Sequence, residues 1–220
     1  MILLNEDATK VDYSQYQIDA IVSDPPYLIN YDTNHADRFN SDRSKEFGRE
    51  FGARPAKNWE NIDNEYIDFS FIFNMGVKKI ALFGANNFTN QLPDGGSWCV
   101  WDKRLIKADK ILGSQFELIW FFPARRYDFI RYLFAGMVGA QLEDTKKKVH
   151  PTQKPVEVMK EVIIRLKLKD GATILDPFMG SGSTGVACQY LGYKFIGVEK
   201  NNNYFKVAKK RLWRPLIELC

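Results

Sequence analysis

A glycine-rich turn between a strand and a helix is the feature that most constrains how this chain can fold. Residues 173–175 form a short apolar run expected to be a buried strand, and GSGSTG at 180–185 follows with the spacing G-x-G-x-x-G. The helix expected next ends before Gly192, and a second strand over 193–198 leads to Glu199. A strand, tight turn, helix and strand in this order form the unit from which doubly wound α/β sheets are built.

The same turn predicts a ligand site. Small residues let the backbone approach a ligand closely, and an acid such as Glu199 can accept hydrogen bonds from ribose hydroxyls. By itself the unit fits a nicotinamide dinucleotide as well as an adenosyl group. A triphosphate loop is disfavoured because no Gly-Lys-Ser/Thr ending is present. A dinucleotide-dependent oxidoreductase is disfavoured because only about twenty residues follow Glu199, too few for a second mononucleotide half.

A second motif, Asp24-Pro25-Pro26-Tyr27, follows the apolar strand expected over 18–22. An exocyclic base amine is a poor nucleophile because its lone pair is delocalised into the ring. A carboxylate that accepts one N–H, with a backbone carbonyl accepting the other, draws the nitrogen toward tetrahedral geometry and frees that lone pair. Proline holds the carbonyl in place by fixing φ, and the tyrosine ring can stack on a base. The motif favours chemistry on a base amine, although a lone Asp-Pro-Pro-Tyr could equally end a strand without function.

A third segment, HPTQKP at 150–155, leads into the helix expected over 156–166. The polar side chains of Thr152, Gln153 and Lys154 are expected near the carboxyl ends of the strands, where the carboxylate of a cofactor could be held. For His150 alone, a plain helix entry with the ring on the surface is the preferred interpretation.

The remaining pattern predicts further strands over 2–4, 80–83, 98–101 and 116–122, and helices over 67–75 and 204–213. Residues 31–65 differ in kind, with charges of both signs, several glycines and few aliphatic residues. A long loop of this sort is usually functional or mobile. The fold class expected is therefore α/β, with a doubly wound, mostly parallel sheet.

Composition fits one soluble domain over residues 1–220, with 45% hydrophobic and 26% charged residues. No apolar run reaches the roughly 18–20 residues of a membrane span, and the start of the chain is typical of a strand, not of a signal peptide. The three cysteines form no CxxC and the chain has two histidines, which argues against a metal site and for a reducing compartment.

Charge is unevenly distributed along the chain. The formal net charge is +4, yet from Lys146 onward bases exceed acids by about nine, whereas the preceding part is acidic by about five. A basic surface could hold phosphates through counterion release. A solvated, lysine-rich helix face explains the charge equally well, so charge permits nucleic-acid binding without requiring it.

Together, the three segments resemble the β group of DNA amino-methyltransferases, in which an Asp/Ser-Pro-Pro-Tyr segment precedes Asp-Pro-Phe-x-Gly-x-Gly-Thr/Ser-Thr. Here Asp24–Tyr27 comes first, DPFMGSGST at 176–184 comes last, and HPTQKP lies upstream of the latter, as in the family. The resemblance extends from residue 2 to about residue 211. It implies a Rossmann-like, mostly parallel, seven-stranded sheet in a circularly permuted chain, with S-adenosyl-L-methionine as cofactor and no metal.

The resemblance also implies roles for individual residues. Asp24, Pro25, Pro26 and Tyr27 would be catalytic, with Tyr27 stacking on a base flipped out of the duplex. Asp7 could accept from the cofactor's adenine amine, although a plain turn acid is the alternative. The cofactor-binding residues would be Asp7, Ala8, Asp24, Thr152, Gln153, Lys154, Asp176, Phe178, Gly180, Gly182, Ser183, Thr184, Glu199 and Lys200.

No separate target-recognition domain fits between the strand over 116–122 and His150. Recognition of DNA is therefore expected from the loop at 31–65, from 103–110 and from an insert at 124–149. The basic residues Arg125, Arg126, Lys146, Lys147 and Lys148 are expected to contact phosphates at the edge of the cleft.

The function implied is methyl transfer to adenine N6 in double-stranded DNA. Cytosine N4 is the alternative, disfavoured because members that act on cytosine more often carry serine at the position of Asp24. An inactive nucleic-acid-binding module is the alternative of another class. The expected location is the cytoplasm of a bacterial or phage-infected cell, without membrane contact. A homodimer and a cognate restriction endonuclease are partners that the sequence leaves open.

Overall fold

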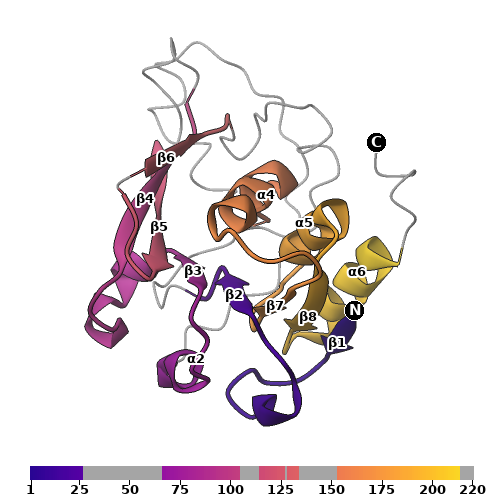
Figure 1. The fold of residues 1–220 in the computed structure, drawn as a ribbon. Coiled ribbons are helices and arrows are strands. Elements are labelled where there is room, and N and C mark those ends of the chain that lie inside the picture. The colour runs from indigo at the N-terminus through magenta and orange to yellow at the C-terminus, as the bar shows by residue number, and fades with distance from the viewer. Residues whose placement is uncertain (27–65, 105–113, 127, 134–152, 214–220) are drawn as a thin grey trace, which may run out of the picture.

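The computed structural model describes residues 1–26, 66–104, 114–126, 128–133 and 153–213 (Figure 1). Its centre is an eight-stranded sheet flanked by helices, which confirms the expected α/β class. The strands are β1 (Ile2–Leu4), β2 (Ala20–Ser23), β3 (Ile80–Phe83), β4 (Ser97–Asp102), β5 (Phe116–Phe122), β6 (Asp128–Arg131), β7 (Thr173–Asp176) and β8 (Lys194–Val198). The helices are α2 (Ser70–Asn74), α4 (Val156–Arg165), α5 (Ser183–Leu191) and α6 (Asn202–Leu212), with short 3-10 turns η1 (Tyr13–Gln15), η3 (Ala85–Asn87) and η4 (Thr89–Gln91).

Strand order brings the two ends of the chain together. The order is β1-β8-β7-β2-β3-β5-β4-β6, and the five strands from β1 to β3 run parallel. β2, from the start of the chain, lies beside β7, from its last third, with Ile21 opposite Leu175. Because parallel strands end at the same edge of a sheet, the segments after β2 and β7 meet there. We call this the carboxyl edge, where β2, β3, β7 and β8 end.

The sheet has eight strands where seven were expected. The additional strand, β6, lies within the segment 124–149 that was expected to be an insert, and it pairs in parallel with β4, with Cys99 opposite Asp128. Ile130 is buried, whereas its neighbours on β6 are exposed, as is usual for an edge strand. A charged four-residue segment with one buried apolar side chain carries little strand signal, which is why the sequence did not reveal it.

Two hydrophobic cores lie on opposite faces of the sheet. On one face α4, α5 and α6 lie side by side (Figure 1). The apolar side of α4 contributes Val158, Met159, Val162 and Ile163 to that core, at the spacing that a helix buried on one side requires. The other face is covered by α2 and the 3-10 turns, through buried residues such as Phe69 and Phe88. Helices on both faces explain why the central strands are apolar throughout.

Two helices differ from their expected bounds. The helix expected over 67–75 is reduced to α2, because Asp68 accepts a hydrogen bond from the backbone of Ser70 and Gly76 adopts a left-handed conformation, with φ of 67°. α6 begins before residue 204 because Asn201 caps it, accepting from the backbone N–H groups of Asn203 and Tyr204. Within the described ranges, no helix has the length and apolar character to cross a membrane.

Candidate active site

A buried carboxylate joins the first and last motifs at the carboxyl edge. Asp176, the last residue of β7, is 2% exposed and accepts hydrogen bonds from Ser23 Oγ at 2.6 Å and from Phe178 N at 3.1 Å. Its other oxygen accepts from Thr184 Oγ1 at the start of α5. Ser23 directly precedes Asp24 on the chain. Asp176 therefore ties the Asp-Pro-Pro segment to the glycine-rich turn.

Burial governs the ionisation of this carboxylate. It raises the pKa of Asp176 to about 7, against the pull of the hydrogen bonds from Ser23, Thr184 and Phe178, and the charge of Asp24 raises it further. A carboxyl whose pKa is higher in the folded state stabilises the fold at low pH. That contribution is lost as the pH rises through about 7.

We expect Asp176→Asn to remove this pH dependence. The difference in unfolding free energy between wild type and Asp176→Asn should shrink by about 1–3 kcal/mol between pH 5 and pH 8, because the amide cannot ionise. Urea denaturation across this range measures it. The exposed Asp94→Asn serves as control and should keep a constant difference from wild type. If the difference in unfolding free energy between wild type and Asp176→Asn is also independent of pH, the Asp176 carboxyl of the wild type does not titrate in this range.

Asp24 belongs to a row of alternating charges. Its Oδ2 lies 2.6 Å from Lys154 Nζ, and the same ammonium lies 3.4 Å from Glu117 Oε2. Glu117 pairs through its other oxygen with Lys103. Lys154 is 7% exposed, so this charge is held away from water by carboxylates on both sides.

The pairing sets the charge state of Glu117. Burial would raise the pKa of this carboxyl, but the positive charges of Lys154 and Lys103 outweigh burial and hold the pKa below its ordinary value. Glu117 is thus ionised at neutral pH, and Lys154 stands between two carboxylates. This arrangement holds the Asp24 carboxylate in one orientation.

The position of Lys154 differs from what the sequence suggested. It was expected to contact a cofactor carboxylate, but its described contacts are with Asp24 and Glu117, because the segment before α4 passes beside the end of β2 and the start of β5. Sequence reasoning missed Glu117 and Ser23, and it assigned Lys103 to DNA recognition, whereas the structure pairs Lys103 with Glu117. A lone acid in the apolar strand FELIWFF was the signal that could have identified Glu117.

The glycine-rich turn is held by Glu199. One carboxylate oxygen accepts from Gly180 N at 3.0 Å and the other from Asn201 N at 2.7 Å. Burial raises the pKa of Glu199, with these two backbone donors acting in the opposite direction. A carboxylate has about four acceptor positions, so the two bonds leave capacity for further donors such as ribose hydroxyls.

Gly182 is required by packing, which differs from the expected close approach to a ligand. Its φ is +83°, and a methyl group on its Cα would lie 3.2 Å from Leu212 Cδ1 and 3.3 Å from Ala208 Cβ, both on α6. The expectation that a side chain at Gly182 would block a ligand is therefore wrong in direction. The added atoms would face a helix of the core.

We expect Gly182→Ala to destabilise the fold. Gly192 is the matched control, because its φ is +76° and a methyl group there would meet nothing within 4 Å. Both variants carry the strain of a left-handed alanine, and Gly182→Ala should cost about 1 kcal/mol more because α6 must move. Thermal unfolding of both variants measures the difference. Equal losses would mean that α6 yields without cost.

A cavity at the carboxyl edge gathers eight of the fourteen expected cofactor-binding residues. Among its lining is the hydroxyl of Ser183, which is buried and has no hydrogen-bond partner among the described residues. Such an atom is costly unless a ligand or water satisfies it. The lining residues are Asp24, Gln153, Lys154, Met159, Asp176, Phe178, Met179, Gly180, Ser181, Ser183 and Thr184.

The segment after β1 lies at the same edge, next to the residues that follow β8. Glu199 N donates to Leu4 O, and Asn5 Nδ2 donates to the carbonyl oxygens of Glu199 and Lys200. Asp7 accepts from the backbone and hydroxyl of Thr9, and these bonds lower the pKa of its carboxyl. Asp7 and Ala8 thus lie in the loop that follows β1. The contacts of Asp7 with Thr9 are those of an acid in a turn, which was the alternative interpretation of this residue.

Several expected residues lie elsewhere. Pro25 and Pro26 are described but are not among the cavity's lining. Tyr27, Thr152 and Lys146–Lys148 fall outside the described residues, as does the loop at 31–65. Within the described ranges, no three His, Cys, Asp or Glu residues gather as metal ligands would.

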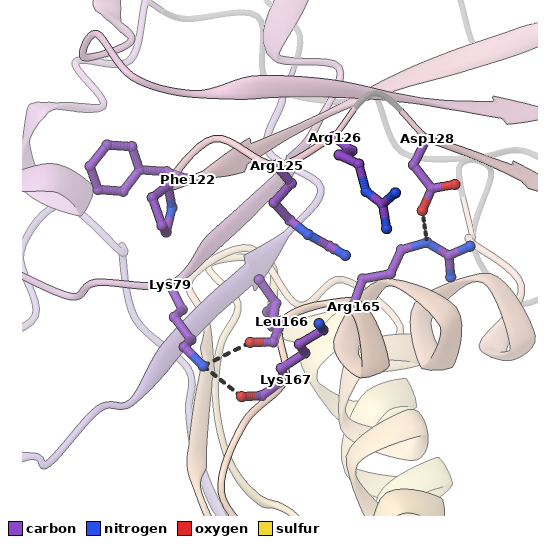
Figure 2. Close-up of a pocket in the computed structure, with 9 residues that line it drawn as sticks. Lys79, Phe122, Arg125, Arg126, Asp128, Arg165, Leu166 and Lys167 are labelled. Atoms are coloured by element: carbon purple, nitrogen blue, oxygen red, sulfur yellow. Dashed lines mark hydrogen bonds and ion pairs between the residues drawn. The ribbon is translucent and has the colours of Figure 1, made fainter.

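Arg125 and Arg126 are not at the carboxyl edge. They follow β5, whose last residue, Phe122, lies opposite Ile80 at the start of β3. β3 is parallel to β2, so both arginines lie at the edge where the parallel strands begin. Figure 2 shows them beside Lys79 and the end of α4. The expected place at the cleft edge is wrong because β5 runs antiparallel to its neighbours.

Comparisons with known proteins agree with this arrangement. The profile of a family described as DNA methylase matches residues 101–210. The chain is 54% identical over 80 residues to a Type II methyltransferase, M2.DpnII of Streptococcus pneumoniae, covering 36% of this chain and 29% of that protein. It is 51% identical over 63 residues to another, M2.LlaDCHI of Lactococcus lactis subsp. cremoris, covering 29% and 23%. These matches span under a third of either relative's length.

A solved structure shares the fold. The crystal structure of the M1.HpyAVI–SAM complex superposes with a TM-score of 0.57 at 22% sequence identity, covering 97% of this chain and 99% of that one. At this identity the likeness concerns the arrangement of helices and strands.

Proposed function

This chain belongs to the DNA methylase family, whose profile matches half of it, and from this premise we propose that it methylates an exocyclic amine in double-stranded DNA with S-adenosylmethionine as the methyl donor. The observation that supports this most is the link Ser23–Asp176–Thr184. It places Asp24 next to the glycine-rich turn at one cavity, although Ser23 and Asp176 lie 153 positions apart in the sequence. Such a link is what transfer between a cofactor and a base requires.

The residues that line the cavity suit the proposed cofactor. The glycine-rich turn, Phe178 and the unpartnered hydroxyl of Ser183 would hold the molecule, with Glu199 toward its ribose. When bound, S-adenosylmethionine supplies an electrophilic methyl group on a sulfonium sulfur.

Asp24 is proposed to act on the target amine. As an ionised carboxylate paired with Lys154, it accepts a hydrogen bond and donates none. The contact with the amine N–H would strengthen as the nitrogen lone pair forms the new N–C bond and the nitrogen becomes positive. The methyl–sulfur bond would break in the same step, and its electron pair would stay on sulfur, leaving a neutral thioether. The proton then lost from nitrogen passes to solvent. Lys154 and Glu117 hold the carboxylate in place for this step.

The base is proposed to be adenine, attacked at N6 after it is flipped out of the duplex. Aspartate at position 24 favours adenine, and cytosine N4 is the second candidate on the same chemistry. Tyr27 would stack on the flipped base. Target recognition is assigned to 31–65, 103–110 and 124–149, except that residues 128–131 also form β6 of the sheet.

Partners and location follow from the same premise. Duplex DNA is the substrate, and a cognate restriction endonuclease in the cytoplasm of a bacterial or phage-infected cell is the partner proposed. A homodimer, which the sequence left open, can be tested by light scattering. The relatives' names place them among Type II methyltransferases, which supports this setting.

One experiment tests the function and the base together. The purified protein is incubated with duplex DNA and S-adenosylmethionine carrying a labelled methyl group, and the DNA is digested to nucleosides. We expect label in N6-methyladenine. Label in N4-methylcytosine would support methyltransferase activity but overturn the assignment of adenine as the target base. If the protein binds the cofactor but neither base is labelled, the result would favour an inactive binding module.

A further inference from the structure

We propose that the basic pocket formed by Lys79, Arg125, Arg126, Arg165 and Lys167 binds a phosphate group, at a site separate from the active site and beyond the proposed methyl transfer. The pocket has a volume of about 580 Å³ and lies where β5 ends, β3 begins and α4 ends (Figure 2). Its lining contains five basic side chains and one acidic one, Asp128.

The pocket is remote from Asp24. α4 starts next to Lys154, which pairs with Asp24, and ends at Arg165 in the pocket wall. Its ten residues span about 15 Å. A ligand in this pocket therefore does not contact the catalytic carboxylate.

Two of the five positive charges are already engaged. Lys79 Nζ donates to the carbonyl oxygens of Leu166 at 2.8 Å and Lys167 at 2.6 Å, where it satisfies the end of α4. Arg165 pairs with Asp128 at 2.9 Å and with Glu161. The one acidic group of the lining is thus neutralised within the wall.

The other three charges form no ion pair within the described part of the chain, although the charge of Arg125 acts on Asp128. Among the described residues, no ion pair includes Arg125, Arg126 or Lys167; Arg125 instead stacks on the ring of Phe121, 5.3 Å from its centre. Figure 2 shows the side chains of Arg125, Arg126 and Lys167 directed toward a common space. Like charges held together repel each other, and a bound anion offsets that repulsion.

Lys167 carries a second, independent indication. Its φ is 49°, which makes it the one residue other than glycine with a positive φ in the described part of the chain. It follows α4 at the position where glycine or asparagine is preferred, since side chains with a Cβ are strained there. This lysine thus accepts some backbone strain, and its side chain lines the pocket.

Phosphate is the anion that this set of donors suits. Guanidinium groups bind phosphate oxygens through two parallel N–H bonds, and a lysine adds a compact charge. A volume of about 580 Å³ can take a group larger than one phosphate. Small phosphate compounds and the phosphodiester backbone of a DNA segment share this chemistry.

The test compares a pocket variant with a variant of equal charge. Arg126→Gln/Lys167→Gly removes two positive charges from the pocket, and Lys206→Gln/Lys210→Gln removes two from the exposed side of α6. Calorimetry at constant ionic strength measures the binding of inorganic pyrophosphate, and a second titration uses a duplex oligonucleotide. We expect the pocket variant to lose at least about tenfold in pyrophosphate affinity and the α6 variant less than about twofold.

The duplex titration identifies the source of the phosphate. If the pocket variant also loses duplex affinity beyond the α6 variant, a DNA backbone reaches the pocket; if it does not, the ligand is a small phosphate compound. Lys167→Gly alone should keep or raise the melting temperature, because it relieves the strain. The proposal is overturned if the two double variants bind both probes equally, or if Lys167→Gly lowers the melting temperature. Neither titration depends on methyl transfer.

Discussion

Replacing Asp24 with alanine is expected to lower the rate of methyl transfer by about 10²–10³-fold, the usual loss when one preorganised electrostatic partner of a reaction is removed. The carboxylate contact strengthens as the target nitrogen becomes positive, so its loss should affect turnover more than ground-state binding. The fold should survive, because Lys154 keeps its second carboxylate, Glu117, at 3.4 Å. Single-turnover transfer of a labelled methyl group to duplex DNA measures the effect.

Asp24→Asn separates charge from shape. The amide keeps one acceptor oxygen but loses the ion pair with Lys154. We expect it to be strongly impaired, yet more active than the alanine variant, with cofactor and DNA affinities close to wild type. A near wild-type rate in Asp24→Ala would refute the catalytic assignment. Loss of cofactor binding in Asp24→Asn would instead assign the residue to the cofactor site.

The second large effect is expected for Lys154→Met. This change leaves Asp24 and Glu117 as facing carboxylates without the ammonium between them. Breaking a buried pair by removing one partner costs about 3–5 kcal/mol, and the partial exposure of both carboxylates lowers the expected cost to about 2–3 kcal/mol. Methyl transfer should also fall, because Asp24 loses the contact that orients it. Urea denaturation and single-turnover transfer measure the two effects.

The pH dependence of this variant has a defined sign. In wild type the pKa of Glu117 is lowered, so its ionisation stabilises the fold above the ordinary pKa, and that contribution is lost as the pH falls through the lowered value. Without Lys154, Lys103 alone opposes the effect of burial, so the pKa of Glu117 should rise and the loss of stability should grow as the pH rises from 5 to 7.5. A loss that is independent of pH would contradict this account.

Two further variants serve as controls for Lys154→Met. Lys154→Met/Glu117→Gln should recover part of the stability, because the second change removes a buried carboxylate that has lost one of its two lysine partners. Lys154→Arg should retain more transfer than Lys154→Met, since a positive charge remains beside Asp24. No recovery in the double variant would mean that Lys154 contributes to stability by packing alone, through contacts such as that with the ring of Phe83.

Local sequence determined the elements and the motifs of this protein. The turn at 180–185, with Glu199 after the next strand, predicted a strand and a helix, which the structure contains, and a ligand site at the edge where the structure has a cavity. These features depend on neighbours a few residues apart, namely periodic apolar residues, left-handed glycines and caps such as Gly192. The family resemblance rested on the same short segments.

Contacts between distant segments were decided by the tertiary structure. The partners of Lys154, the packing of Gly182 against α6 and the edge at which Arg125 lies all depend on strand order and direction. One antiparallel strand, β5, moved the arginines to the far edge and brought Glu117 to the carboxyl edge. Sequence alone determined which functional groups this protein carries, because each residue's chemistry is fixed by its identity. Only the fold decided which of these groups come into contact, because contacts between distant segments depend on which strands pair.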